Sequence, residues 1–192
     1  MGVKAIEKSG KAIKVRTASE SIETELVLLG LGVRPNTTLA KSAGINIGET
    51  GAIMANENMK TNISRVYACG DCAEAYHRIL KRNVWIPLGD TAKKQGRVAE
   101  ANIAGEVISF PGIIGTSATK LFDLEVARTG PGEAEATREG FDVYTTLIES
   151  NTSAHCYSGL KPIMIKLIFE KVTRKLRSPC YRGEAVAKRK DI

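Results

Sequence analysis

The stretch Thr61-Asn-Ile-Ser-Arg-Val-Tyr-Ala-Cys-Gly-Asp-Cys-Ala-Glu74 decides how the rest of this chain is interpreted. Its apolar run, Val66 to Ala68, ends abruptly at Gly70-Asp71, and small residues follow. This pattern predicts a buried strand over residues 65–68 that presents one carboxylate at its carboxyl end, where open α/β sheets bind ligands. Because glycine lets the backbone approach closely, Asp71 beside Gly70 suits hydrogen bonding to the hydroxyls of a nucleotide or ribityl chain. The alternative is an ordinary strand and turn with a surface aspartate.

Four motifs, which occur in the family's order along the chain, resemble those of one enzyme family. The stretch around Asp71 is similar to the second flavin-binding motif of the FAD- and NAD-linked disulfide reductases, in which this Asp holds the ribityl chain of FAD. Residues 25–36 resemble the crossover from the NAD domain to the FAD domain, and residues 87–99 resemble the helix whose amino end faces the flavin. Residues 115–133 resemble the opening of the dimerisation domain. NADH oxidases and coenzyme A disulfide reductases are the members it resembles most, from about Ile13 to Leu176.

The resemblance implies a fold class of α/β plus α+β: the remnant of a FAD/NAD-binding Rossmann-like domain followed by an α+β dimerisation domain. Residues 1–33 would end the NAD-binding domain, residues 34–111 would form the second FAD-binding segment, and residues 112–192 would form a truncated C-terminal dimerisation domain. The implied cofactors are FAD, through a partial site, and NAD(P)H in the complete enzyme. The expected partner is a second copy in a homodimer, or a complementing N-terminal half.

The second expected flavin contact is the amino end of a helix predicted over residues 91–108, just after Gly89. Unpaired N–H groups and the positive end of the helix dipole favour negative charge there. In the family that charge is the pyrimidine edge of the reduced flavin, so Thr91 and Ala92 are implied as backbone contacts. Asp90 stands where the family has Thr or Ser. We expect Asp90 to cap the helix, although its carboxylate would repel an anionic flavin.

His155 and Tyr157 are the catalytic candidates. They lie in a His-Cys-Tyr-Ser-Gly segment that resembles the family segment whose His and Tyr reach the active site of the partner subunit. The resemblance implies that a Tyr hydroxyl there hydrogen-bonds or protonates the leaving thiolate. The family's Tyr-Tyr-Pro run is Tyr-Ser-Gly in this chain. The alternative is a structural His and Tyr in a loop before a strand.

Two features of the complete family enzymes have no counterpart in this sequence. No Gly-x-Gly-x-x-Gly follows a predicted strand, because Gly30-Leu-Gly32 leads into Arg34-Pro35 and proline cannot continue a phosphate-binding helix. The family's redox-active cysteine lies near its amino terminus, whereas the first cysteine here is Cys69. We therefore expect a flavin-dependent oxidoreductase segment that is inactive in isolation. The alternative is a non-enzymatic dimerisation or interaction module.

The pair Cys69 and Cys72 forms a Cys-x-x-Cys motif that a redox dithiol or half of a zinc site would also show. A dithiol of this kind follows a thioredoxin-like β-α-β pattern, and zinc requires two further paired ligands. The sequence shows neither, so we predict no metal site. Four cysteines without a signal peptide or scaffold spacing indicate a reducing, cytoplasmic setting.

Length and composition fit a globular chain. With 192 residues, 43% of them hydrophobic, the chain can bury one good core or two small ones. No apolar stretch approaches the ~18 residues of a transmembrane helix. The net charge of +7 lies mostly after Lys171. We interpret this tail as a solvated terminus rather than a nucleic-acid surface, because it lacks interleaved aromatic residues.

Hydrophobic periodicity predicts the remaining elements. The expected strands span residues 11–17, 22–31 (apolar enough to be buried on both faces), 120–129, 141–149 and 162–170. Short helices are expected over Thr38–Ala43, ended by Gly44, and over Glu133–Glu139, and the helix over 91–108 would bury Ala92, Gly96, Ala99 and Ile103. The later strands predict an antiparallel sheet with helices on one side. Beyond Lys175 no central strand is expected, because Pro179 cannot donate to a ladder.

Overall fold

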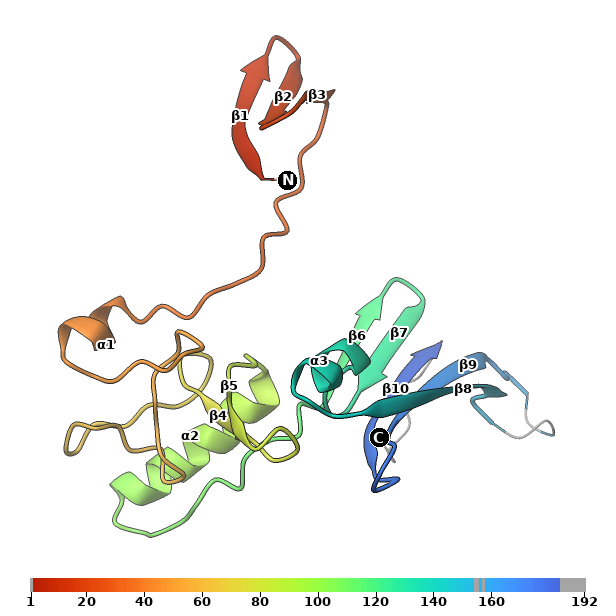
Figure 1. Ribbon diagram of the computed structural model, residues 1–192. Coiled ribbons are helices and arrows are strands. Elements are labelled where there is room, and N and C mark those ends of the chain that lie inside the picture. Colours follow the sequence, from red (N-terminus) through yellow and green to blue (C-terminus); the bar gives the residue numbers. More distant parts are fainter. Residues whose placement is uncertain (1, 154–155, 157, 184–192) are drawn as a thin grey trace. The chain divides into compact units, whose positions relative to one another are not determined.

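The computed structural model describes residues 2–153, 156 and 158–183, and the chain forms two compact units, Met1–Arg34 and Pro35–Ile192. Figure 1 shows the elements of both units in chain order. The first unit is a three-stranded antiparallel meander of β1 (Val3–Ser9), β2 (Ala12–Thr17) and β3 (Ser21–Thr24). Strand β2 confirms the strand expected at residues 11–17, whereas β1 was not predicted.

The prediction of a buried strand over residues 22–31 is wrong. Strand β3 ends at Thr24, and the leucines beyond it are 66–91% exposed: Leu26, Leu28, Leu29 and Leu31. A strand that is apolar on both faces needs a covering layer on each face and neighbours at its edges. Within this unit β3 pairs only with β2. The result is an exposed apolar run over residues 26–33.

The second unit begins with a segment of short elements: α1 (Thr38–Ser42), β4 (Ala75–His77), β5 (Arg82–Val84) and α2 (Gly89–Ile103). Helix α1 lies where it was predicted and is followed by Gly44 at φ +76°. The strand predicted over residues 65–68 does not form, and Tyr67 makes only an isolated antiparallel bridge with Lys60. Hydrogen-bonded loops take its place.

Helix α2 differs from the prediction at both ends and in its buried face. It starts two residues earlier, at Gly89, and stops at Ile103, because Gly105 adopts φ +99° and the Glu106 amide bonds back to the Ala101 carbonyl. The buried side chains are Gln95, Val98, Ala99 and Asn102, whereas Ile103 is 65% exposed. Of the predicted face, Ala99 alone is buried.

Two small hydrophobic cores organise this segment. One contains Met59, Ala75, Val98, Ala99 and Phe110, with Cys69 against it. The other contains Ala40, Ile53, Ala68 and Ala73, with Cys72 against it. Helix α2 therefore turns its Val98–Ala99 side to the first core. The partners of the helix decide which face is buried, and the spacing of its small residues does not.

The C-terminal part is a five-stranded sheet with strand order β6-β7-β10-β9-β8, and every pairing is antiparallel. Its elements are β6 (Ser117–Leu121), β7 (Leu124–Arg128), α3 (Glu133–Arg138), β8 (Val143–Asn151), β9 (Pro162–Glu170) and β10 (Leu176–Gly183). The antiparallel sheet, α3 and β9 confirm the predictions, and β8 lies two residues later than expected. The single strand predicted over 120–129 is wrong, because the chain reverses at Phe122 (φ 54°) to form the β6–β7 hairpin.

Strand β10 corrects the expectation that Pro179 would prevent a central strand. The Pro179 carbonyl accepts a hydrogen bond from the Thr129 amide at 3.1 Å, but proline has no N–H to return to the Thr129 carbonyl. The hydroxyl of Ser178, which is fully buried, donates to that carbonyl at 2.5 Å. A neighbouring side chain thus replaces the missing ladder donor, and the strand stays in the centre of the sheet.

The two faces of this sheet differ. The Lys166 ammonium pairs with Glu133 of α3, which places α3 over the face that carries Lys166. Side chains alternate along a strand, so Ile165 and Phe169 point to the opposite face, where Tyr144 stacks on Phe169 with ring centroids 5.3 Å apart. Ile148, opposite Ile165 in the ladder, is 40% exposed on this face. We call it the open sheet face: Tyr144, Ile148, Ile165, Leu167, Phe169 and Tyr181.

Backbone and side-chain contacts join the β4–β5 hairpin to the C-terminal part. The Ile113 amide donates to Tyr76 and the Arg78 amide donates to Ile113, each at 2.8 Å. Arg82 of β5 forms an ion pair with Glu139 at the end of α3. His77 is 2% exposed at this junction, and its Nδ1 accepts hydrogen bonds from the backbone amides of residues 79 and 80.

We predict that Ser178→Ala lowers the free energy of unfolding by about 1 kcal/mol, because it removes the Ser178 hydroxyl that donates to the partly buried Thr129 carbonyl. In a Pro179→Ala background the new Ala amide can donate to that carbonyl, so the same substitution should cost about 1 kcal/mol less. Urea unfolding of the four proteins of this double-mutant cycle measures the difference. An equal cost in both backgrounds would contradict the assigned role of Ser178.

We predict that the chain loses stability as the pH falls below 6.5. Burial lowers the pKa of His77 below its ordinary value of 6.5, Arg82 and Arg128 lower it further, and Glu135 opposes them. The unfolded chain therefore binds more protons below pH 6.5, and the stability contributed by neutral His77 is lost as the pH falls toward the folded-state pKa. The slope from this group is at most about 1.4 kcal/mol per pH unit.

Urea unfolding between pH 5 and pH 8 measures this dependence. His77→Gln keeps an acceptor for the backbone amides and cannot titrate, so it should flatten the curve between pH 5 and pH 6.5. A curve as steep as that of the unsubstituted chain would show that other groups are responsible.

Candidate functional site

The loop that carries Asp71, residues 69–74, is held at both ends by backbone hydrogen bonds; we call it the Asp71 loop. Before it, the Ala68 amide donates to the Met59 carbonyl at 3.0 Å. In its second half, the Cys72 carbonyl accepts a hydrogen bond from the Ile53 amide at 2.8 Å, and the Glu74 amide donates to the Ile53 carbonyl at 2.9 Å, as in a parallel bridge. These hydrogen bonds, in place of the predicted strand, fix the positions of the two ends of the loop.

Within the loop, Gly70 and Asp71 have the properties that a ligand contact requires. Gly70 adopts φ +81°, a conformation that favours glycine. Asp71 is exposed, and its carboxylate makes no hydrogen bond or ion pair with the residues that the structure describes. Its backbone carbonyl accepts a hydrogen bond from Trp85 Nε1 at 2.8 Å. The carboxylate is therefore held on a fixed backbone and is available to an external hydroxyl.

Gln95 of α2 forms hydrogen bonds to this loop on both sides of Asp71. It was not identified from the sequence as a site residue. Its Oε1 accepts a hydrogen bond from the Gly70 amide at 2.8 Å, and its Nε2 donates to the Glu74 carbonyl at 3.1 Å. The side chain is fully buried. No sequence pattern marked it, because it stands between Lys94 and Gly96 and its burial is a property of the fold; a buried amide requires polar partners.

The first turn of α2 lies beside the Asp71 loop. A Cβ built on Gly70 would lie 3.6 Å from the Ala92 Cβ, so these two predicted site residues are neighbours. The Ala92 amide bonds to the Leu88 carbonyl at 2.9 Å and is occupied within the helix. Gly89, Asp90 and Thr91 supply the first-turn amides that have no carbonyl partner within the helix. Thr91, rather than Ala92, thus offers a backbone donor.

Asp90 does not cap α2 as expected. The N-cap is Leu88, which makes no side-chain capping bond, and Asp90 lies in the first turn. Its carboxylate pairs with Lys94 one turn later, with 2.6 Å between Oδ2 and Nζ. Both side chains are well exposed, so the pair is worth little to stability. The pair does place the Lys94 ammonium beside the Asp90 carboxylate. This positive charge offsets the repulsion that the carboxylate would exert on an anionic ligand.

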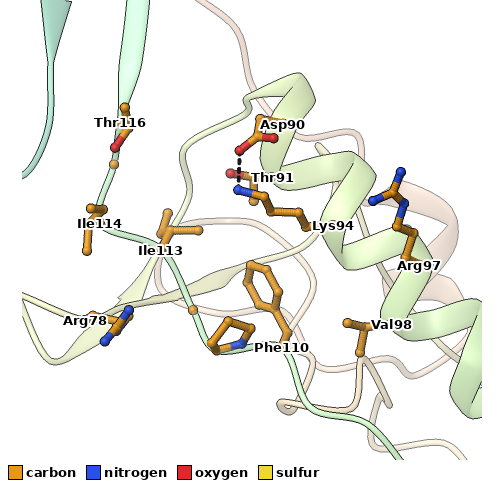
Figure 2. Close-up of a pocket in the computed structure, with 13 residues that line it drawn as sticks. Arg78, Asp90, Thr91, Lys94, Arg97, Val98, Phe110, Ile113, Ile114 and Thr116 are labelled. Carbon is orange, nitrogen blue, oxygen red and sulfur yellow. Dashed lines mark hydrogen bonds and ion pairs between the residues drawn. The ribbon is translucent and has the colours of Figure 1, made fainter. Parts of the chain in front are cut away.

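A cavity of about 640 Å³ opens between this end of α2 and the linker over residues 110–116 (Figure 2). Figure 2 shows Asp90, Thr91 and Lys94 on the helix side and Phe110 and Ile113 on the linker side. Thr91 therefore lines the cavity and also belongs to the first turn of α2. The lining carries more positive than negative charge: Arg78, Lys94 and Arg97 against Asp90.

The geometry opposes a reactive dithiol at Cys69 and Cys72. All four cysteines are free, and Cys72 Sγ lies 3.5 Å from the Cys69 carbonyl. Burial raises the pKa of the Cys69 thiol, and the neighbouring Cys72 raises it further. A raised pKa keeps the thiol protonated and weakly nucleophilic at neutral pH. The two cysteines also pack against different hydrophobic cores.

His155 and Tyr157, the predicted catalytic residues, lie outside the described residues, so their roles stay predictions. Cys156 between them is exposed. Within residues 2–153, 156 and 158–183, no group of three or more His, Cys, Asp and Glu side chains is placed to hold a metal ion. Over the same residues, no helix has both the length and the apolar character needed to cross a membrane.

Two family models match this chain. The first, pyridine nucleotide-disulphide oxidoreductase, matches residues 1–101, and the second, the dimerisation domain of pyridine nucleotide-disulphide oxidoreductase, matches residues 116–189. Among curated relatives, an NAD(P)H sulfur oxidoreductase (CoA-dependent) from Pyrococcus furiosus is 46% identical over 90% of this chain and 39% of its own length. An NADH oxidase from Enterococcus faecalis is 31% identical over 88% of this chain and 38% of its own.

Two solved structures also match nearly the whole of this chain. A NAD-dependent persulfide reductase from A. fulgidus has a TM-score of 0.89 and 36% identity, over 99% of this chain and 36% of that one. Reduced CoADR-RHD from Bacillus anthracis has a TM-score of 0.87 and 34% identity, over 99% of this chain and 34% of that one. The chain thus spans about two fifths of the length of the relatives it matches.

Proposed function

Since this chain belongs to the pyridine nucleotide-disulphide oxidoreductase family, we propose that it forms the flavin-facing and dimer-forming part of an NAD(P)H-dependent flavoenzyme. The observation that carries the proposal is the position of the exposed Asp71 carboxylate on a fixed loop beside the first turn of α2. The two groups belong to segments 20 residues apart in sequence, and the fold brings them together.

The residues present fit FAD. Asp71 would accept hydrogen bonds from ribityl hydroxyls, and Gly70, without a side chain, would let the cofactor approach the backbone. The Thr91 amide at the positive end of α2 would hold the pyrimidine edge. Lys94, paired with Asp90, offsets the negative charge at the same end. Bound FAD would pass the electron pair of NAD(P)H to a disulfide, a persulfide or oxygen, while these residues bind and orient it.

The substrate class rests on the relatives. One curated relative carries the name NAD(P)H sulfur oxidoreductase (CoA-dependent), and a structural relative is a NAD-dependent persulfide reductase. NADH oxidases match at lower identity. We therefore place coenzyme A disulfides or persulfides ahead of oxygen as the substrate of the complete enzyme. Four free cysteines fit the reducing, cytoplasmic setting inferred from the sequence.

The dimerisation domain and the open sheet face support a homodimer. Tyr144 and Ile148 are about 40% exposed on a face that α3 does not cover. An exposed apolar patch of this kind is typical of a protein–protein interface. A second copy of this chain is the partner that the family assignment favours.

The apolar run over residues 26–33 supports a second association. Its leucines are mostly exposed, and its composition is that of a strand buried within a parallel sheet. A polypeptide that supplies neighbouring strands, with the Gly-x-Gly-x-x-Gly fingerprints of the family, would cover it.

A non-enzymatic dimerisation module is the second candidate. Its supporting observation is that the sheet β6–β7–β10–β9–β8 pairs all its strands within residues 117–183. Such a module would dimerise without binding flavin.

We predict that the purified, flavin-free chain binds FAD saturably and that Asp71→Asn weakens binding about tenfold or more, because the charged acceptor for the ribityl hydroxyls is lost. Flavin fluorescence measures the affinity. Asp123→Asn, at the β6–β7 turn, is the matched control and should leave the affinity unchanged.

Binding that appears only after addition of a chain bearing a Gly-x-Gly-x-x-Gly fingerprint would indicate a site shared by two polypeptides. Equal affinities for the Asp71→Asn variant and the unsubstituted chain would refute the role of Asp71. Absence of FAD binding by a folded dimer, with or without such a chain, would favour the dimerisation module.

We predict that the chain sediments as a dimer of about twice 20.7 kDa and that Ile148→Glu shifts it toward the monomer, because a carboxylate on the open sheet face would be desolvated in the interface. Leu147→Glu is the matched control, since Leu147 is 60% exposed on the opposite face of the same strand. Dissociation by Leu147→Glu alone would assign the interface to the α3 side.

A further inference from the structure

We propose that Gln95 is the positioning residue of the flavin site, holding the Asp71 loop and the amino end of α2 in register. This inference rests on the proposed function and adds to it a residue that touches no cofactor. Among the residues that the structure describes, Gln95 is the one side chain that bonds to the loop on both sides of Asp71, through the Gly70 amide and the Glu74 carbonyl.

The geometry makes the bridge specific for an amide. One partner is a donor and the other an acceptor, at 2.8 and 3.1 Å, so the side chain must both accept and donate. Gln95 is fully buried, and water cannot replace it without entering the core. A side chain without the amide would leave the Gly70 amide and the Glu74 carbonyl without this partner. We expect the loop then to shift so that these groups form other hydrogen bonds.

The position of Gln95 on the helix explains the coupling. Gln95 lies four residues after Thr91, so the two are neighbours one turn apart on α2. Its carboxamide therefore links the helix that carries the Thr91 amide directly to the loop that carries Asp71. The Ala92 methyl group, 3.6 Å from where a Cβ on Gly70 would lie, shows that the helix surface runs close to the loop at the same place. A ligand held at both ends depends on how helix and loop lie relative to each other, since misplacing one contact weakens it.

The test compares Gln95→Met with Asn102→Leu in the full chain. Both substitutions remove a buried amide of α2 that bonds to backbone groups, because Asn102 donates to the Val98 and Ile108 carbonyls at 2.8 Å each. Asn102 lies two turns further along the helix, away from the Asp71 loop. The two variants should therefore lose similar thermal stability, while Gln95→Met alone should disturb the site.

Two measurements test whether Gln95 positions the Asp71 loop. Amide hydrogen exchange in the flavin-free chain should show faster exchange at Gly70 in Gln95→Met and unchanged exchange there in Asn102→Leu. FAD affinity should fall about tenfold in Gln95→Met, as expected for two lost hydrogen bonds, and by less than twofold in Asn102→Leu.

Unchanged protection of Gly70 in Gln95→Met would overturn the proposal, and so would equal losses of FAD affinity in both variants. If the unsubstituted chain and its complemented form bind no FAD, the proposed function fails. The exchange of Gly70 then decides by itself whether Gln95 holds the loop.

Discussion

The requirement that buried backbone groups find hydrogen-bond partners governs the segment around Asp71 in this protein. The stretch leading to Asp71 has the sequence of a strand inside a parallel sheet, yet among the described residues it pairs with no parallel strand. It makes one antiparallel bridge, between Lys60 and Tyr67, and the parallel bridge between Ile53 and Ala73 comes after Asp71. Loop carbonyls and amides and the carboxamide of Gln95 satisfy the groups that a sheet would otherwise satisfy. The position of the Asp71 carboxylate, and hence the proposed function, depends on these substitutes.

The same requirement explains why the two ends of the chain behave differently. The C-terminal sheet pairs all its strands with one another, and it restores even the donor that Pro179 lacks through the hydroxyl of Ser178. The apolar run after β3 has no such partners in the described part of the chain, and its leucines are exposed. A segment with the composition of a buried strand and no covering layer is the form expected of a surface that associates with another polypeptide.

Sequence patterns predicted elements well where local signals and the folded environment agree. Helix α1, helix α3 and strand β9 lie where their periodicity and terminal glycines placed them, because each element's own residues define its limits. The patterns failed where a local backbone turn or distant packing partners decide the outcome. Gly105 ends α2 before the predicted stop, and packing against Met59 and Phe110 buries Val98 with Ala99, whereas Ile103 of the predicted face stays exposed. The β6–β7 turn at Phe122 is another such case, since a positive φ at an aromatic residue has no sequence signature.

The sequence by itself determined the family and the order of its segments, and it marked Asp71 as the candidate ligand-binding carboxylate, because the motifs that carry the family resemblance are continuous in sequence. Only the tertiary structure decided that Gly70 lies against Ala92, that Thr91 rather than Ala92 has an amide to offer, and that Gln95 ties helix to loop. These are relations between segments some 20 residues apart. They depend on which backbone groups remain unpaired after folding, and that quantity belongs to the whole fold and to no single stretch of residues.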